Sequence, residues 1–417
     1  MKPIYSKILY WRKQNIRIKQ CTWSGGVTIR IAHFSWESLH SIHVGGISAV
    51  VTELAAAQER MGHEVHIFTR IGPGQKDYER IDGVHYHRCS FAFNPDFIQE
   101  MNNMSKSMAH AFFGCEDYSG KFDIIHGHDW HVVTALDEIK KARNKRVVWT
   151  LHSSQFGRDG NKFNGGNAQV INGIEWYGTY IADRVITCTN VMKQEAQWIH
   201  RVPEEKMRVV HNGINPWIFD SASADPGEVK KRYNIGVMDP TVLFVGRITY
   251  QKGPDLLLEA IPDVLKDWPN AKFIFVGDGY MKSHLEDRAH QLGVAHATRF
   301  TGWISDVKTK GELFKACDVV CVPSRNEPFG IVVLEAWAAG KPVIAIHGTG
   351  AGEIVWHDVT GVRVYGYPDS IAWGIKHIFS DFDRARWMGK NGRYAVEKSF
   401  TWDHIARVTQ KVYEELV

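Results

Sequence analysis

The stretch VLFVGRITYQKG, residues 242–253, decides the fold, because an apolar run passes directly into a glycine loop that carries two cations. A short apolar run followed by polar loop residues and then by a helical pattern is typical of a buried strand in a parallel sheet. Parallel sheets bind ligands beyond the carboxyl ends of their strands. We therefore expect Arg247 and Lys252 to lie at a binding edge, where they would neutralise an anion such as a diphosphate.

The same pattern runs through both halves of the chain. In the first half, apolar runs occur in VTIRIAHFS, HEVHIFT, FDIIHGHDWH, KRVVWTLH, DRVITCT and MRVVHNGI, and a helical pattern occupies ISAVVTELAAAQERMG. In the second half, the runs are PTVLFVGR, AKFIFVGDG, ATRFTGW, DVVCVPS and KPVIAIH. Strands that alternate with helices predict parallel sheets. The predicted fold class is α/β, with two doubly wound, Rossmann-like domains that face each other across a cleft.

Domain boundaries follow from these two series, since 417 residues exceed what one hydrophobic core usually serves. We expect an N-terminal domain over residues 29–213, a second domain over 214–397, and a C-terminal helix over 398–417 that packs back on the first domain. Residues 1–28 carry six basic residues and no acidic one, so we expect a basic extension outside the fold. No apolar stretch approaches a membrane span, and at most a weak association with an anionic membrane surface is expected.

Composition excludes several function classes. The net charge is only +4 and no long basic stripe is present, so nucleic acid is not expected as a partner. The six cysteines show neither a paired CxxC nor a disulfide framework, which favours buried thiols in a reducing cytoplasm. HYHRC, with His85 and His87, predicts the polar face of a strand, and SDFDRAR, with Asp381 and Asp383, predicts a solvated loop. No metal and no cofactor are expected.

Two glutamates in RNEPFGIVVLEAW, residues 325–337, suggest how a ligand is held. The Pro-Phe-Gly turn predicts a helix that starts near Gly330, with free backbone amides at its N-terminus. Glu327 precedes this terminus, and Glu335 follows Gly330 by about 7.5 Å along the helix axis. The two carboxylates would hold two ends of an extended polyhydroxylated ligand. A glycosidase pair is one alternative, and a simple ion pair of Glu335 with a cation is another.

The combination G-R-x-x-x-x-K-G and E-P-F-G-x-x-x-x-E resembles the donor domain of retaining GT-B glycosyltransferases. The most similar groups are the family-4 enzymes and the glycogen and starch synthases. HGHDWH (126–131), TLHSSQFGRDGN (150–161) and the first glycine loop and helix also resemble segments of this group. The resemblance extends from about residue 30 to the C-terminus. One departure is His43 in H-V-G-G, where glycogen and starch synthases usually have lysine.

The resemblance implies roles for particular residues. A catalytic group would stabilise the leaving diphosphate and hold the reacting sugar: Arg247, Lys252, Glu327 and His152. A donor-binding group would hold the rest of the nucleotide sugar, with Glu335 on the ribose hydroxyls and the glycines approaching the phosphates: Gly45, Gly46, Glu335, Phe329, Gly330 and Ile331. A third group would line the sugar or acceptor side: Asp129, His131 and Arg158. The glycine-rich GTGAGE would form a loop under the donor phosphates, next to Glu353.

The resemblance also implies a reaction. Glucose would pass from ADP- or UDP-glucose to a hydroxyl of a glycan acceptor with retention at the anomeric carbon, as in the elongation of an α-glucan. The partners would be a nucleotide-diphosphate sugar and a glycan. The alternatives are a family-4 mannosyl- or N-acetylglucosaminyltransferase for cell-surface glycoconjugates, a nucleotide-sugar epimerase of the same fold, and a catalytically silent glycan-binding protein.

Overall fold

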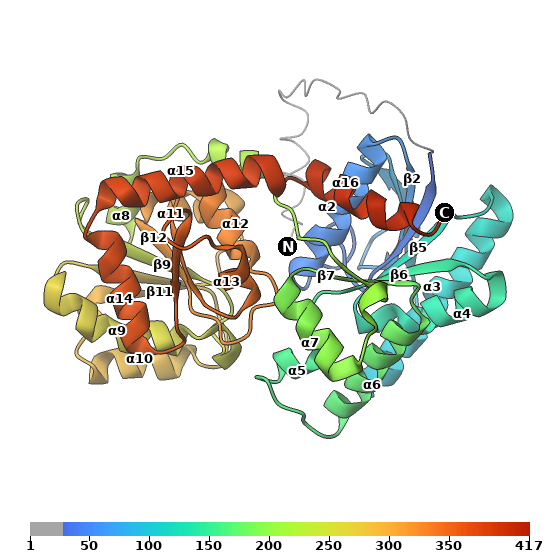
Figure 1. Ribbon diagram of the computed structural model, residues 1–417, viewed down its shortest axis with the longest axis horizontal. Helices are drawn as coiled ribbons and strands as arrows, with labels where there is room; N and C mark the ends of the chain where they lie inside the picture. The colour runs from blue at the N-terminus through green and yellow to red at the C-terminus, as the bar shows by residue number, and fades with distance from the viewer. Residues whose placement is uncertain (1–27) are drawn as a thin grey trace.

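A computed structural model describes residues 28–417 and divides them between two α/β domains that lie side by side (Figure 1). The predicted basic extension lies outside the described residues, apart from Thr28. In the part of the chain that is described, no helix is both long enough and apolar enough to span a membrane.

An eight-stranded sheet forms the centre of the first domain, in the order β3-β4-β2-β1-β5-β6-β7-β8. Only the β3–β4 pair is antiparallel. The strands are β1 (Arg30–Phe34), β2 (Glu64–Arg70), β3 (Tyr78–Ile81), β4 (Val84–Cys89), β5 (Ile124–His128), β6 (Arg146–Leu151), β7 (Arg184–Thr187) and β8 (Met207–Val209). The helices are α2 (Gly46–Arg60), α3 (Phe97–Ser119), α4 (Val133–Arg143), α5 (Gln155–Arg158), α6 (Asn167–Ile181) and α7 (Asn190–His200), with 3-10 turns η1 (Trp130–Val132) and η2 (Glu204–Lys206).

A six-stranded parallel sheet forms the centre of the second domain, in the order β11-β10-β9-β12-β13-β14. The strands are β9 (Thr241–Val245), β10 (Lys272–Val276), β11 (Thr298–Gly302), β12 (Val319–Val322), β13 (Val343–Ile346) and β14 (Gly361–Val364). The helices are α8 (Pro226–Arg232), α9 (Pro254–Asp267), α10 (Lys282–Gln291), α11 (Val307–Ala316), α12 (Ile331–Ala338), α13 (Gly350–Ile354), α14 (Pro368–Phe379) and α15 (Phe382–Ser399), with 3-10 turns η3 (Pro216–Ser221), η4 (Tyr250–Lys252) and η5 (Ala295–Ala297).

Both sheets are covered by helices on both faces, which confirms the predicted doubly wound fold. In β1, Ile31 enters a core with helix α2, whereas Ala32 and Phe34 enter a second core with α3 and α4. In β9, the consecutive residues Leu243 and Phe244 likewise enter two different cores. Because consecutive side chains of a strand point to opposite faces, strands buried on both faces read as unbroken apolar runs.

Each predicted run contains a strand, but the hairpin turn between β3 and β4, strand β14 and the long helix α3 were not predicted. The hairpin turns at Asp82 and Gly83, whose φ values are 51° and 84°. An Asp-Gly pair with both φ values positive is a common two-residue hairpin turn. Strand β3 escaped notice because it is largely exposed, whereas HYHRC, which was expected to form the polar face of a strand, lies in β4.

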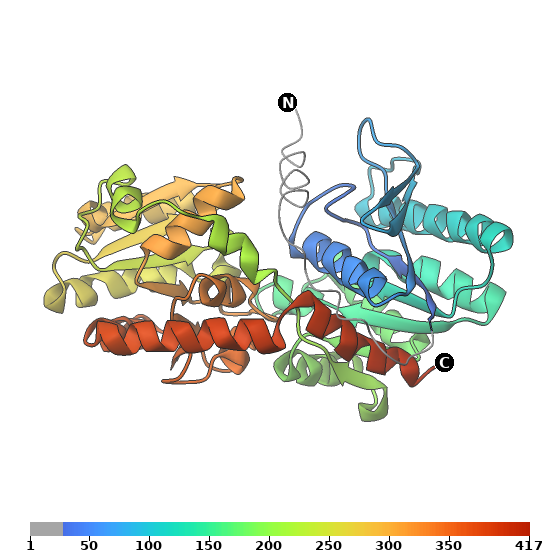
Figure 2. The same cartoon turned by 90° about the horizontal axis from the view of Figure 1, so that it is seen from above.

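The last helix, α16 (Trp402–Glu414), leaves the second domain and packs on α2 of the first (Figures 1 and 2). The amide of Ile214 donates to the carbonyl of Phe400 at 2.8 Å, so the two segments that cross between the domains are paired at the junction. Arg60 forms an ion pair with Asp403. These contacts hold the two sheets with the carboxyl ends of their strands toward each other.

Loops that follow the strands meet between the domains. The hydroxyl of Thr189 donates to the carbonyl of Pro328 at 2.8 Å. The side-chain amide of Asn326 donates to Oδ1 of Asn161 at 2.7 Å. The Glu-Pro-Phe-Gly turn of the second domain therefore lies directly against loops of the first.

Candidate functional site

Lys252 and Glu327, predicted to act on different parts of one ligand, lie in contact. Lys252 Nζ is 2.7 Å from Glu327 Oε2, and the Ser324 hydroxyl donates to the same oxygen at 3.0 Å. The amide of Arg325 donates to the carbonyl of Gln251 at 2.9 Å, which fixes the two loops against each other. Because both charged side chains are largely buried, the pair is held in a defined place at the end of the sheet.

Gly253 explains why a glycine follows the loop lysine. Its φ is +65°, and a Cβ at this position would lie 2.0 Å from the carbonyl oxygen of Pro323. Only a residue without a side chain allows η4 to turn into α9 so close to the end of β12. The glycine thereby fixes the position of Lys252 beside the Glu327 turn.

We expect Gly253→Ala to lower the free energy of unfolding by about 2–5 kcal/mol, from left-handed strain plus steric overlap. Urea denaturation measures the change. Gly293→Ala is the matched control, because its φ is +72° and its added Cβ would meet nothing within 4 Å. If the two variants lose equal stability, the contact with Pro323 does not constrain the loop.

Arg247, at the end of β9, is exposed, and its Nη2 lies 3.3 Å from Oε1 of Gln251. This long contact with a neutral amide leaves the guanidinium charge uncompensated by it. Arg247 and the Lys252–Glu327 pair belong to one loop system at the carboxyl edge of the second sheet. An anionic group placed here would contact the exposed guanidinium of Arg247 and the ammonium of Lys252, which Glu327 holds in place.

Glu335 lies on α12 and forms an ion pair with Lys310 of α11, with 2.6 Å between Lys310 Nζ and Glu335 Oε1. The Lys310 side chain is 26% exposed and the Glu335 side chain is 14% exposed. The simple ion pair that the sequence left open as an alternative is therefore present. The second carboxylate oxygen, Oε2, is the one that remains for a diol on a ligand.

The N-terminus of α12 faces the first domain. Gly330 caps the helix with a φ of 93°, and Phe329 is buried. A Cβ on Gly46 would lie 3.3 Å from Cδ1 of Ile331, so the first glycine loop and this helix start approach each other closely. The structure thus brings together Gly46, Gly330 and Ile331, which the resemblance assigned to donor binding.

Glu37 gives the glycine loop a partner that the sequence analysis did not identify. Its buried carboxylate accepts from the amides of Val44 and Gly45 at 2.7 and 2.6 Å. The expectation was that the backbone at Gly45 and Gly46 approaches the donor phosphates. A carboxylate on the same amides would compete with a phosphate for them.

Asp129 is buried, and its carboxylate contacts the backbone of His152. Its Oδ1 accepts from the His152 amide at 2.7 Å, and its own φ is 58°. Burial raises the pKa of Asp129 to about 7, although the nearby Arg158 charge opposes this shift. Contact of Asp129 with sugar or acceptor stays a prediction, beside the contact with the His152 amide that the structure shows.

His131 and Arg158 are also engaged inside the first domain. The His131 ring stacks on Trp36 at 4.2 Å and is buried. Arg158 forms an ion pair with the fully buried Glu175 at 2.7 Å. Direct contact with sugar or acceptor stays a prediction for both side chains.

Buried histidines from three adjacent strands form a hydrogen-bonded row that ends at His152. His152 Nε2 lies 3.0 Å from His128 Nδ1, and His128 Nε2 lies 3.0 Å from His33 Nδ1. The row continues from His33 to Gln58 at 2.7 Å. Gln58 then donates to the Tyr413 hydroxyl, which also contacts His126. The neighbouring positions of β1, β5 and β6 explain the row, since His33 is in register with His126 and His128 with Thr150.

These histidines predict acid sensitivity. Burial lowers the pKa of both His33 and His152 from 6.5 to about 4, and it lowers the pKa values of His126, His128 and His131 well below 6.5. Between pH 6.5 and 4 the unfolded chain binds more protons than the native one, so the free energy of unfolding decreases as the pH falls. The slope is up to about 1.4 kcal/mol per pH unit for each imidazole. The raised pKa of Asp129 has the opposite effect, because it increases the free energy of unfolding as the pH falls. Asp129 is a single group, however, whereas five histidines decrease the free energy of unfolding.

Urea midpoints at pH 7 and pH 5 test this expectation. His33→Asn removes one buried imidazole and should make the midpoint less dependent on pH. His296→Asn is the control, because that ring is exposed at the surface. A midpoint that does not change between pH 7 and pH 5 would contradict the prediction.

Two further sequence predictions are modified. Asp381 caps the N-terminus of α15 by accepting from the Arg384 amide at 2.9 Å, and Asp383 forms an ion pair with Arg386, so this segment is a helix start rather than a loop. Glu353 accepts from the amides of Asn190 and Val191 at 2.9 and 2.8 Å. The GTGAGE segment therefore joins the two domains through the N-terminus of α7.

Comparisons with known proteins agree with this architecture. Residues 44–217 match the family model of Glycosyltransferase Family 4, and residues 226–395 match that of Glycosyl transferases group 1. An uncharacterized glycosyltransferase of Methanocaldococcus jannaschii is 38% identical over 93% of this chain and 98% of its own length. The glycogen synthase of Mycobacterium tuberculosis is 27% identical over 92% of this chain and 94% of its own length.

The solved structure of the sucrose-phosphate synthase from Thermosynechococcus elongatus superposes with a TM-score of 0.75, at 23% identity. The match covers 93% of this chain and 99% of that one, so it includes both domains and their arrangement. The family matches and the full-length relative confirm the resemblance that the sequence motifs suggested. This chain belongs to glycosyltransferase family 4 and has the GT-B fold.

Proposed function

We propose that the chain is a retaining hexosyltransferase that moves glucose from ADP- or UDP-glucose to a hydroxyl of a glycan, as in α-glucan elongation. The observation that carries the proposal is the Lys252–Glu327 pair, held at 2.7 Å at the carboxyl edge of the second sheet with Arg247 exposed beside it. A cation for the leaving diphosphate then adjoins a carboxylate for sugar hydroxyls. The similarity to a glycogen synthase supports glucose as the transferred sugar.

In this mechanism the bond between the anomeric carbon and the diphosphate oxygen breaks as negative charge grows on the phosphate. Arg247 and Lys252 stabilise that charge. The acceptor oxygen attacks from the same face, and its proton passes to the departing phosphate oxygen. His152 is held by Asp129 and by the histidine row, and we propose that it contacts the reacting sugar from the first domain.

A hollow in the first domain is suited to the acceptor. It has a volume of about 410 Å³ and is lined by residues of the α5–α6 segment, among them Phe156 and Phe163. Trp198 of α7 packs against Phe156 with ring centroids 5.3 Å apart and is 56% exposed. Exposed aromatic faces beside polar groups are suited to the apolar faces of sugar rings. Asn161, in the same segment, contacts Asn326, which places the hollow beside the Glu327 turn.

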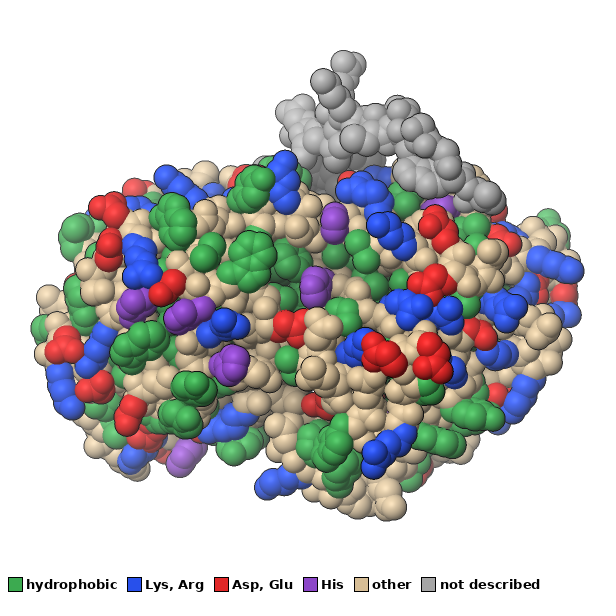
Figure 3. Space-filling model, viewed as in Figure 1, with side chains coloured by type: hydrophobic (Ala, Val, Ile, Leu, Met, Phe, Trp, Pro, Cys, Tyr) green, Lys and Arg blue, Asp and Glu red, His purple; other side chains and the backbone are tan. Residues whose placement is uncertain are grey.

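Surface charge is consistent with small-molecule and glycan partners. On the face shown in Figure 3, basic and acidic side chains are interspersed rather than gathered by sign. A nucleic-acid partner would favour a basic stripe. The described cysteines are free thiols, most of them buried, which suits a reducing cytoplasm.

Donor turnover tests the proposal. The purified chain is incubated with ADP-glucose, UDP-glucose, GDP-mannose or UDP-N-acetylglucosamine, with maltooligosaccharides as acceptors. Chain extension from a glucose donor, with α-linkages by NMR, is the expected result. Transfer from only the mannose or N-acetylglucosamine donor would overturn glucose as the sugar, and conversion of a donor without an acceptor would indicate an epimerase.

A further inference from the structure

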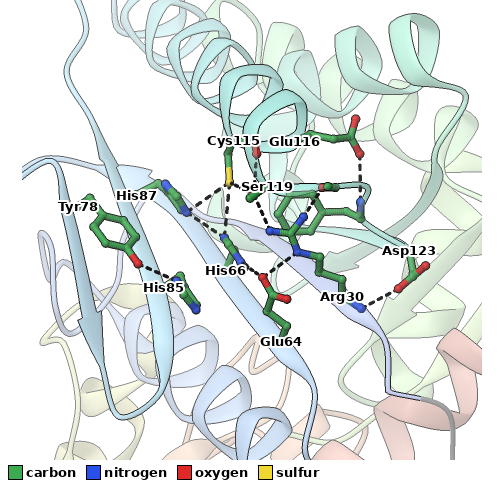
Figure 4. A network of polar contacts seen from close by, with 12 residues as sticks. Arg30, Glu64, His66, Tyr78, His85, His87, Cys115, Glu116, Ser119 and Asp123 are labelled. Carbon is green, nitrogen blue, oxygen red and sulfur yellow. Dashed lines mark hydrogen bonds and ion pairs between the residues drawn. The ribbon is translucent and has the colours of Figure 1, made fainter.

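A second polar cluster lies in the first domain, apart from the loops that carry the transfer site. His66 of β2, His87 of β4 and Cys115 of α3 point toward one another (Figure 4). His66 Nδ1 is 2.9 Å from His87 Nε2. Cys115 Sγ is 3.7 Å from His66 Nδ1 and 3.8 Å from His87 Nε2. Three elements far apart in the sequence thus bring three ligand atoms to one point.

These distances match the edges of a metal coordination sphere. A tetrahedral zinc ion with nitrogen ligands at 2.0–2.1 Å and sulfur at 2.3 Å has nitrogen–nitrogen edges of about 3.3 Å and nitrogen–sulfur edges of about 3.6 Å. The observed nitrogen–sulfur distances agree within about 0.2 Å. The two imidazoles would separate by about half an ångström to admit the ion.

The surroundings of His66 orient it as a ligand. Its Nε2 lies 2.9 Å from Glu64 Oε1, and Arg30 Nε lies 2.7 Å from the same oxygen. The Nε2–H group therefore donates to the carboxylate, and Nδ1 presents its lone pair to the cluster. A histidine ligand whose other ring nitrogen donates to a carboxylate is the common arrangement around protein-bound metals, because the carboxylate fixes the tautomer and raises the basicity of the ligand.

We propose that His66, His87 and Cys115 bind one divalent cation of borderline softness, with Zn²⁺ as the preferred ion. Two imidazole nitrogens and one thiolate form a ligand set that zinc prefers over magnesium or calcium. On binding, the thiol of Cys115 releases its proton to the solvent. The fourth ligand is a water molecule, which can enter because Cys115 is only partly buried and Ser119 beside it is exposed.

Another histidine cluster is a weaker candidate. His33, His126 and His128 also bring ring nitrogens together, and all three rings are buried. Both nitrogens of each ring already have hydrogen-bond partners, through Gln58, His128, Tyr413, Thr150 and His152. An ion there would break this whole row, whereas an ion at Cys115 would replace only the His66–His87 contact and the contacts of the thiol with these two rings.

The sequence expectation for HYHRC was a polar strand face and no metal. His85 fits the polar strand face, because its Nδ1 contacts the Tyr78 hydroxyl at 2.8 Å. His87 differs because the parallel pairing of β2 with β4 brings it beside His66, and because α3 adds the thiol. Ligands contributed by a neighbouring strand and by a helix cannot be identified from a local histidine pattern.

The position of the cluster indicates a structural role. His66 is near the beginning of β2, so it lies toward the end of the sheet opposite the loops that meet the second domain. The ion would join β2 and β4 to α3 and stabilise the native state by binding it in preference to the unfolded chain. Glycosyl transfer itself is not expected to need the ion.

Metal content tests the site. The tag-free full-length chain is stripped with a chelator, titrated with Zn²⁺, desalted and analysed by mass spectrometry for bound metal, and its melting temperature is measured with and without zinc. We expect one tightly held zinc per chain, a higher melting temperature with zinc, and a thiolate-to-metal absorption band when Co²⁺ replaces zinc.

Variants locate the ion. Cys115→Ser and His87→Gln should lose the stoichiometric zinc, the absorption band and the zinc-dependent stabilisation. Cys321→Ala, which removes a buried thiol from the second domain, should keep all three. If Cys115→Ser folds poorly, His87→Gln still tests the site. Zinc retained at full stoichiometry in both ligand variants, or no tight zinc in the natural chain, would overturn the proposal.

Discussion

Replacement of Lys252 by alanine is expected to lower turnover by about 10²–10³-fold, the loss typical of removing one preorganised group that stabilises transition-state charge. The ammonium is fixed by Glu327 at 2.7 Å and the Lys252 side chain is only 21% exposed, so water would replace the ammonium poorly. The free energy of unfolding should also fall, because Glu327 is left largely buried without its cation, but the variant should remain folded under assay conditions. Donor turnover at saturating substrate and urea denaturation measure the two quantities.

Lys266→Ala is the matched control for this substitution. Lys266 lies in the same domain and also forms an ion pair, 3.2 Å from Asp263, but it is 73% exposed on the outer side of α9. It should keep full turnover. Near-normal turnover of Lys252→Ala would remove the lysine from the catalytic group, whatever the control shows.

A double-mutant cycle separates two roles for Lys252. If the lysine serves only to position Glu327, then Glu327→Ala and the double variant should be equally slow. If the lysine also contacts the leaving phosphate, the double variant should be slower than Glu327→Ala alone. We expect the second outcome, because the loop of Lys252 also carries the exposed Arg247.

The sequence predicted the fold well for a physical reason. Buried parallel strands such as β9 and β12 require continuous apolar residues, and their loops require glycine and charged residues at fixed spacing. These are local properties that can be read in one dimension. The hairpin strand β4 has no continuous apolar run, because His and Arg alternate with its apolar residues.

The predicted site was less complete, because charged side chains find partners that are distant in sequence. Glu37 binds the glycine-loop amides, and Lys310 binds Glu335, yet neither residue belongs to a motif in the sequence. Asp129 carried a signal for function but is buried and holds the His152 amide. A signal for the histidine row did exist: histidines at or near the ends of β1, β5 and β6, which the strand order makes neighbours.

Glu335 and Lys310 provide the second large prediction, because their ion pair distinguishes a ligand-binding carboxylate from a structural one. We expect Glu335→Ala to weaken binding of the nucleoside diphosphate by about 100-fold, as a carboxylate that accepts from a ribose diol contributes hydrogen bonds of about 1.5–3 kcal/mol each. Isothermal titration of the variant with ADP and UDP measures the loss. Folding should be affected little, since both partners are partly exposed.

Lys310→Ala breaks the same ion pair by removing the partner of Glu335 instead of Glu335 itself. If Glu335 grips the ribose, Lys310→Ala should change the dissociation constant only a few-fold, and the effect of Glu335→Ala should remain when both are replaced. If Glu335 instead serves only to hold α11 against α12, the two single variants should lose equal affinity and equal stability, because each breaks the same 2.6 Å contact. Equal losses would therefore remove Glu335 from the donor-binding group while leaving the roles of Lys252 and Glu327 intact.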